Sequence, residues 1–168
     1  MTRAISIGAS LDATTMIDLI IEDGEWVRAI PEMDALAQSC QKAAITLERG
    51  LDGEIALLAG DDEALRTLNE RFRNKNTPTN VLSFPSDGRP GFLGDIALGR
   101  EICVREAAEK GISLHDHAAH LIVHGMLHLI GYDHQGTADA EAMERREAEI
   151  LALLGIADPY EGAAEAET

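Results

Sequence analysis

The sequence contains few cysteines and no long apolar run. Its 168 residues include only two cysteines, Cys40 and Cys103. Two cysteines cannot build the disulfide framework of a small secreted domain, so buried free thiols in a reducing compartment are the better interpretation. No apolar run reaches the ~20 residues of a membrane helix, and the N-terminus shows no apolar block ahead of a cleavage site. We therefore expect a cytoplasmic protein with no membrane partner.

Positive charge is also scarce. Lys and Arg total 14 against 30 Asp and Glu, for a net charge of −16. Taken alone, this charge argues against a polyanionic partner. It is uneven, however, because residues 66–75 hold four basic residues and one acidic residue, whereas the chain from Asp139 onward holds nine acidic and two basic residues. A local basic patch remains compatible with a phosphate backbone, since salt-dependent affinity comes from local contacts.

The pattern of apolar residues is typical of a single α+β domain. The length favours one domain, and 45% hydrophobic and 26% charged residues are ordinary for a globular protein. Strands are predicted at 16–23, 53–60, 81–85 and 95–99, with 25–30 as a further short strand or a lead-in. Helices are predicted at 33–48, 63–73, about 101–110, about 114–130 and about 138–154. We therefore predict a small mixed sheet, mostly four-stranded, packed with about five helices over residues 1–160, followed by a flexible acidic tail at 161–168.

The stretch "HLIVHGMLHLIGYDH", which begins at His120, is the most informative part of the chain. His124 and His128 stand four residues apart in a predicted helix, so they share one face and can reach one metal ion. His120 lies on the same stripe, but about two turns (~12 Å) from His128, and a straight helix cannot wrap all three around one ion. A third ligand must therefore lie beyond the helix. Gly131 is suited to reverse the chain in a left-handed conformation, which turns His134 back toward the pair.

Three histidines with a fourth position left for water are typical of a catalytic zinc site and not of a closed structural one. The spacing equals that of the metzincin proteases, H-E-x-x-H-x-x-G-x-x-H. Their glutamate, the general base, is Gly125 here, which counts against a peptidase. We predict one zinc ion per chain bound by His124, His128 and His134, with another divalent transition metal as the alternative.

Two residues near the predicted ligands are candidates for hydrogen bonds to the imidazoles. A metal-bound imidazole usually donates its other N–H to a carboxylate or a carbonyl. Asp133, next to His134, is a candidate for that role, and equally a residue that caps or turns the chain. His120 is a second candidate, and His115 and His117 are expected to cap, pack or hydrogen-bond in the same region.

Several blocks of the sequence are similar to one known family. The segment "HGMLHLIGYDH" (124–134) resembles the signature of the YbeY family, H-G-x-L-H-L-x-G-Y-D-H. "LNERFRNKNTPTNVLSFP" (68–85), "LGDIALG" (93–99) and "ADPY" (157–160) resemble further blocks of that family, so the resemblance covers most of residues 53–160. One position departs from it, because the common T-D-V-L-S-F reads T-N-V-L-S-F here. Asn80 cannot serve as a general base, but it can still cap a turn.

The resemblance implies a metal-dependent, single-strand-specific endoribonuclease that acts in rRNA maturation, at the 3′ end of the small-subunit 16S rRNA, and in ribosome quality control. The three signature histidines map onto His124, His128 and His134 as metal ligands. A basic residue of the second block maps onto Arg73, a catalytic candidate that would hold a phosphate oxygen bidentately; a solvated arginine at a helix end is equally compatible. Expected partners are rRNA in the ribosome or its precursors, and a ribosomal protein or a GTPase.

Residues next to Arg73 are further candidates for binding the phosphates of the RNA. Arg71 and Lys75 are these substrate-binding candidates, whereas Phe72 is expected in the core and not as a base-stacking platform. Two other functions stay open: a ribosome-associated binding factor whose zinc is mainly structural, and a zinc hydrolase that acts on another substrate. Gly125 argues against peptides as that substrate, and an open fourth metal position favours the nuclease over the binding factor.

Overall fold

The protein is built on a four-stranded mixed sheet, as the sequence predicts. The computed structural model describes residues 17–161. The strands are β1 (Ile17–Ile21), β2 (Glu54–Gly60), β3 (Val81–Pro85) and β4 (Phe92–Gly99). Their order in the sheet is β1-β2-β4-β3. Strands β1, β2 and β4 are parallel, and β3 lies at the edge, antiparallel to β4.

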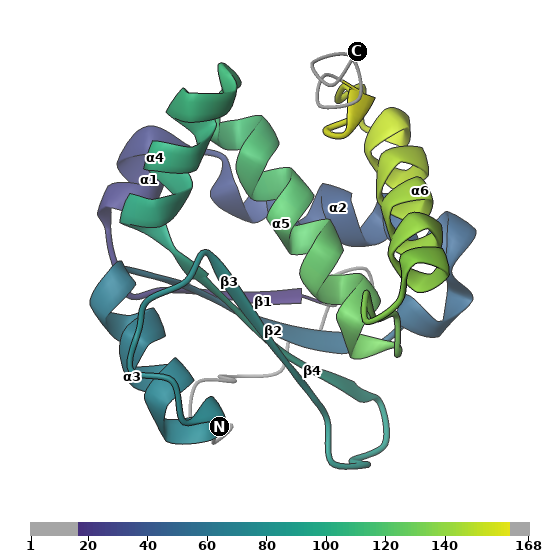
Figure 1. Cartoon of the computed structure of the whole chain (residues 1–168), viewed down its shortest axis with the longest axis horizontal. Coiled ribbons are helices and arrows are strands. Elements are labelled where there is room, and N and C mark those ends of the chain that lie inside the picture. Colours follow the sequence, from purple (N-terminus) through teal and green to yellow (C-terminus); the bar gives the residue numbers. More distant parts are fainter. Residues whose placement is uncertain (1–16, 162–168) are drawn as a thin grey trace.

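Helices cover both faces of the sheet. Within the described residues they are α1 (Glu25–Ala29), α2 (Met33–Leu47), the short 3-10 helix η2 (Arg49–Leu51), α3 (Asp62–Arg73), α4 (Arg100–Lys110), α5 (Leu114–Leu129) and α6 (Thr137–Leu153). Helix α3 packs on one face, and α2 and α5 pack on the other, with α4 and α6 against α5 (Figure 1). The central α5 is buried along most of its length. The predicted α+β class is therefore confirmed.

The two-residue alternation of the strands separates two clusters of side chains. In β4, Ile96 belongs to the main core under α2 and α5, whereas Ala97 belongs to the smaller cluster under α3. In β3, Val81 packs against the main core and Phe84 against the smaller cluster. Strand β3 therefore has α5 on one face and α3 on the other, with its open edge between them.

Some boundaries differ from the predicted ones. Residues 25–30, expected as a short strand or a lead-in, form helix α1 through Ala29. The reason is tertiary, because Trp26 is fully buried and its indole Nε1–H donates to the carbonyl of Gly60 at 2.8 Å. Strand β4 begins at Phe92 and not at residue 95, since the hairpin with β3 continues through a bond from the Ser86 N–H to the Leu93 carbonyl (2.9 Å).

Other expectations are met or lie outside the described residues. Cys40 and Cys103 are free and buried, as expected. The first residue of the predicted strand 16–23 and the tail from residue 162 lie outside the described residues, so the domain extent of 1–160 stays a prediction. Between residues 17 and 161, no helix combines the length and apolar character needed to span a membrane.

Candidate metal centre

The C-terminal end of α5 turns the third histidine back toward the other two. Gly131 has φ +102°, the left-handed conformation expected for it. Its N–H donates to the His128 carbonyl (3.1 Å), and the Tyr132 N–H donates to the Leu127 carbonyl (3.0 Å). These two bonds form the motif that commonly closes helices with glycine at this position. His134 therefore lies beside the last turn of α5.

Two further contacts hold this turn. The Tyr132 hydroxyl donates to the Glu48 carboxylate at 2.6 Å, and the Arg146 guanidinium binds the same oxygen at 2.7 Å. The turn is thereby tied to the end of α2 and to α6. The Asp133 carboxylate accepts the backbone N–H of His134 at 2.7 Å, so the contact of Asp133 is with the backbone of the turn and not with the imidazole.

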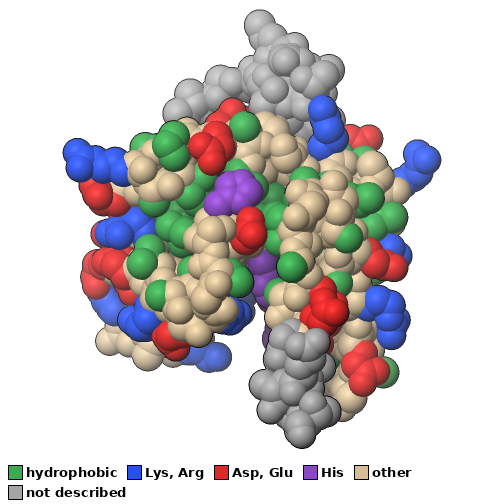
Figure 2. Space-filling view, turned by 90° about the horizontal axis from the view of Figure 1, so that it is seen from above, with side chains coloured by type: hydrophobic (Ala, Val, Ile, Leu, Met, Phe, Trp, Pro, Cys, Tyr) green, Lys and Arg blue, Asp and Glu red, His purple; other side chains and the backbone are tan. Residues whose placement is uncertain are grey.

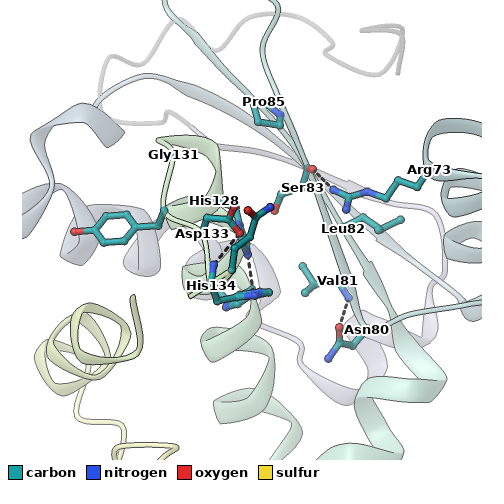
Figure 3. Close-up of a pocket in the computed structure, with 13 residues that line it drawn as sticks. Arg73, Asn80, Val81, Leu82, Ser83, Pro85, His128, Gly131, Asp133 and His134 are labelled. Carbon is teal, nitrogen blue, oxygen red and sulfur yellow. Dashed lines mark hydrogen bonds between the residues drawn. The ribbon is translucent and has the colours of Figure 1, made fainter. Parts of the chain in front are cut away.

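The imidazoles of His124, His128 and His134 converge. One nitrogen of each lies within 4.8 Å of the others, and the Nε2 atoms of His124 and His128 are 3.1 Å apart. Two nitrogens bound at ~2.0–2.1 Å to a tetrahedral zinc ion lie about 3.3–3.4 Å apart. The three side chains are therefore positioned to bind a metal ion. They face a cleft of about 620 Å³, which leaves a fourth side for water or substrate (Figure 3).

The buried carboxylate of Glu147 contacts one of the three histidines on the side away from the cleft. The sequence analysis did not predict this contact. Glu147 of α6 accepts the Nδ1–H of His124 at 2.6 Å. This bond directs the Nε2 lone pair of His124 toward the other two ligands, the arrangement that metal-bound histidines commonly show. The available signal was a charged residue on the apolar stripe of a helix, because Met143 and Ile150 on the same side of α6 are also buried.

Glu147 is held ionised by three donors. Burial alone would raise its pKa, but hydrogen bonds from His120 (2.8 Å), His124 and the Tyr160 hydroxyl outweigh burial and lower the pKa to about 2. Burial and the adjacent carboxylate raise the pKa of Tyr160 above its usual range. The pKa of His128 is lowered, first by burial and then by the neighbouring His124 and His134. A lowered pKa favours the neutral imidazole that a metal ion requires.

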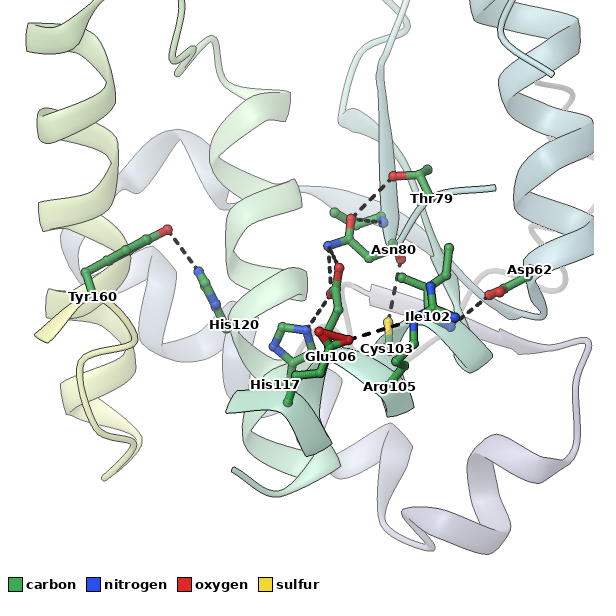
Figure 4. Close-up of polar contacts among 12 residues, drawn as sticks. Asp62, Thr79, Asn80, Ile102, Cys103, Arg105, Glu106, His117, His120 and Tyr160 are labelled. Atoms are coloured by element: carbon green, nitrogen blue, oxygen red, sulfur yellow. Dashed lines mark hydrogen bonds and ion pairs between the residues drawn. The ribbon is translucent and has the colours of Figure 1, made fainter. Parts of the chain in front are cut away.

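Asn80, at the departure from the family pattern, joins a second network (Figure 4). Its side-chain amide donates to the Glu106 carboxylate at 3.0 Å, and the same carboxylate accepts from His117 at 2.8 Å. The Asn80 side-chain oxygen accepts the Val81 N–H at 2.6 Å, at the start of β3. An aspartate here would set two carboxylates against each other, whereas asparagine supplies the donor that Glu106 needs.

Gly125 leaves no room for the side chain that a protease would carry there. A Cβ atom added at Gly125 would lie 3.0 Å from Ile96 Cγ2 and 3.0 Å from Ser83 Oγ. The Ser83 hydroxyl donates to the Gly125 carbonyl at 3.1 Å, so strand β3 rests directly on α5. A side chain at this position would therefore require Ser83 and Ile96 to shift.

Arg73 reaches the cleft of the three histidines from the other side of the edge strand. Its Nη2 donates to the Ser83 carbonyl at 2.9 Å, and its side chain lines the same cleft as His124 (Figure 3). Arg71 and Lys75 are exposed at the end of α3 and do not line this cleft. The roles predicted for these three cations stay predictions.

The expectation for Phe72 was wrong. Its side chain lies in the last turn of α3 and is 40% exposed, outside the core. The helix turns this position outward, where the ring lies 5.4 Å from the Phe84 ring, between centroids, and beside the Arg71 guanidinium.

The fold is that of an α+β protein in which three imidazoles, on a helix and its closing turn, are positioned to bind one metal ion beside an open cleft. In the space-filling view, histidine side chains are visible near the middle of one face, among apolar and acidic groups, with basic groups mostly toward its edges (Figure 2). The model of the family described as Endoribonuclease YbeY matches residues 21–155. The chain belongs to the YbeY family, which confirms the resemblance seen in its motifs.

Two relatives agree with this assignment, and a solved structure shares the fold. Endoribonuclease YbeY of Jannaschia sp. (strain CCS1) is 47% identical over 161 residues, which cover 86% of this chain and 99% of that protein. Endoribonuclease YbeY of Novosphingobium aromaticivorans is 45% identical over 154 residues, covering 82% and 92%. The solution structure of TM1509 from Thermotoga maritima has the same fold, with a TM-score of 0.53 and 22% identity over 83% of this chain and 91% of that one.

Proposed function

We propose that this chain is a metal-dependent endoribonuclease that cleaves single-stranded RNA, with one zinc ion bound by His124, His128 and His134. The observation that carries the proposal is that these histidines and Arg73 line one cleft. Membership of the YbeY family supports RNA as the substrate. A bound divalent metal lowers the pKa of water or polarises a phosphoryl oxygen, and three neutral imidazoles suit zinc.

The side chains around the centre have separate tasks in this proposal. Glu147 holds His124 in the tautomer whose Nε2 is free of a proton. Arg73 uses one N–H on the Ser83 carbonyl, and the remaining donors of its guanidinium can hold a non-bridging phosphate oxygen. Arg71 and Lys75 hold phosphates farther along the strand.

Family membership also supports a more specific substrate. We extend the proposal to rRNA in the ribosome or its precursors, including the 3′ end of the small-subunit 16S rRNA, to ribosome quality control, and to a ribosomal protein or a GTPase as a partner. A mainly structural zinc is disfavoured because the three ligands leave the cleft side open. A zinc peptidase is disfavoured because Gly125 stands where the metzincins carry their glutamate general base.

The test compares four zinc-loaded proteins: wild type, His128→Ala, Arg73→Ala and the control Arg105→Ala, an exposed arginine on α4. A labelled single-stranded RNA with the 3′-terminal sequence of small-subunit rRNA is the substrate, and its duplex is the control. We expect His128→Ala to lose both metal and cleavage. Arg73→Ala should lose cleavage while metal content and unfolding midpoint stay near wild type, because exposed substitutions usually change stability by less than about 0.5 kcal/mol. Wild-type protein that carries zinc and does not cut RNA would refute the proposal.

A further inference from the structure

The end of α3 carries a cluster of aromatic and cationic side chains outside the metal centre. We call Arg71, Phe72, Arg73 and Phe84 the α3-end cluster. The rings of Phe72 and Phe84 lie 5.4 Å apart at a tilt of 56°. The guanidinium carbon of Arg71 lies 5.5 Å from the Phe72 ring centre, and that of Arg73 lies 5.6 Å from the Phe84 ring centre. Phe72 is 40% exposed, so part of its ring is accessible beside the two arginines.

Within the part of the chain that the structure describes, the cations of this cluster have no acidic partner. Among residues 17–161, no ion pair engages Arg71, Arg73 or the adjacent Lys75. Arg66, one to two turns earlier on the same helix, is by contrast paired with Glu63 and Glu70. In a chain of net charge −16, an unpaired basic group beside an exposed ring favours an anionic ligand with an aromatic part.

The cluster begins where the cleft of the metal centre ends. Phe84 points to the α3 side of β3, whereas Ser83 points to the α5 side, where its hydroxyl bonds Gly125. Arg73 contacts both faces of β3. It donates a hydrogen bond to the Ser83 carbonyl at the open edge of the strand and lies over the Phe84 ring on the α3 side. It also lines the cleft on the α5 side. A chain that leaves the cleft over the edge of β3 therefore passes Arg73 and then meets Phe72.

We propose that Phe72, flanked by Arg71, is a stacking subsite for an unpaired nucleobase of the same RNA strand whose phosphate lies at the metal centre. The proposal rests on the proposed nuclease function and adds a binding residue to it. Stacking on an aromatic ring tolerates any base, while arginine and lysine track the backbone. A paired base cannot stack in this way, so the subsite also selects single strands.

The single tryptophan makes a direct test possible. Trp26 is fully buried, so its emission is a constant background. In zinc-loaded Phe72→Trp protein, we expect a 2′-O-methylated oligoadenylate, shown to remain intact by gel, to quench the new emission saturably. The matched duplex should not quench it. The control Val104→Trp places a tryptophan at a position on α4 that is 43% exposed in the wild type, and its emission should not respond.

Cleavage kinetics give the second measurement. Phe72→Ala should raise KM for single-stranded RNA by about 5- to 150-fold, the effect of losing one base–aromatic stack. Phe72→Tyr should restore it, and Val104→Ala should leave it unchanged. If Phe72→Ala cleaves with wild-type KM, or if RNA binds without quenching Phe72→Trp, the stacking subsite is wrong and the nuclease stands. If wild-type protein neither binds nor cleaves RNA, both proposals fail.

Discussion

Glu147 brings a buried negative charge to the back of the metal centre. Its side chain is almost inaccessible to water, and it accepts hydrogen bonds from His120, His124 and Tyr160. A buried charge is tolerated only when it is paired and fully hydrogen-bonded. Two of the donors come from adjacent turns of α5 and the third from Tyr160, after α6, and together they keep the carboxylate ionised where it can orient His124.

Removing this charge should weaken metal binding. Glu147→Gln keeps the shape of the side chain but loses the charge that orients the His124 ring. We expect zinc affinity to fall about 10- to 100-fold, as is typical when the hydrogen-bond partner of a ligand is lost. Competition with a fluorescent chelator measures the change, and Glu141→Gln, at an exposed position on the same helix, is the matched control. Equal zinc affinities for the two variants would show that Glu147 has no such role.

At the scale of elements, the contact between α5 and the edge strand β3 shapes the cleft. The two elements are in direct contact at Gly125, where the Ser83 hydroxyl bonds the helix backbone and Ile96 fills the remaining space. This close approach brings the open edge of β3 and Arg73 over the histidines. A bulkier residue in the helix would push the strand away from the metal centre.

Restoring the glutamate of the protease motif should therefore damage the fold. Gly125→Glu forces a side chain into a space already occupied, and overpacking of this kind costs about 1–3 kcal/mol before the buried charge is counted. We expect a lower free energy of unfolding in urea and no peptidase activity. Gly24→Glu is the control, because nothing lies within 4 Å of a Cβ at Gly24. A variant as stable as wild type would mean that the strand and helix separate easily.

At the scale of the whole molecule, buried histidines and a buried carboxylate link stability to pH. Burial lowers the pKa of both His117 and His128 below the usual 6.5, so below that pH the unfolded chain takes up protons that the folded chain does not. Stability contributed by these groups is present above pH 6.5 and is lost as pH falls. Glu147 has a pKa of about 2 against an ordinary 4.5. The stability that this carboxylate contributes is therefore lost as the pH falls from about 4.5 to about 2.

The measurement is urea unfolding of the metal-free protein from pH 8 to pH 3. We expect the free energy of unfolding to fall below about pH 6.5 and again below about pH 4.5. High salt should be present throughout, because it screens the repulsion of a chain with net charge −16. Zinc affinity should weaken in the same direction, since protons compete for the imidazoles. Stability that rises steadily from pH 7 to pH 4 in high salt would contradict these assignments.

The sequence by itself determined the features that depend on local geometry. The four-residue spacing of His124 and His128 places them on one helix face, and Gly131 is free to adopt the left-handed turn that returns His134. The strands of the mixed sheet followed from alternation at 16–23 and from short apolar runs, such as 53–60 and 81–85, bounded by glycine or closed by proline. The absence of a general base at position 125 could also be read directly, because it depends on the identity of one residue.

Only the tertiary structure decided which distant side chains meet. Glu147 reaches His124 because α6 packs on α5, and Arg73 reaches the cleft because α3 ends beside the open edge of β3. The exposure of Phe72 and the helical conformation around Trp26 were missed for the same reason. Helix periodicity and turn chemistry act over a few residues, whereas these contacts join segments far apart in the chain. Their positions are set by the packing of whole elements, and no local pattern encodes that packing.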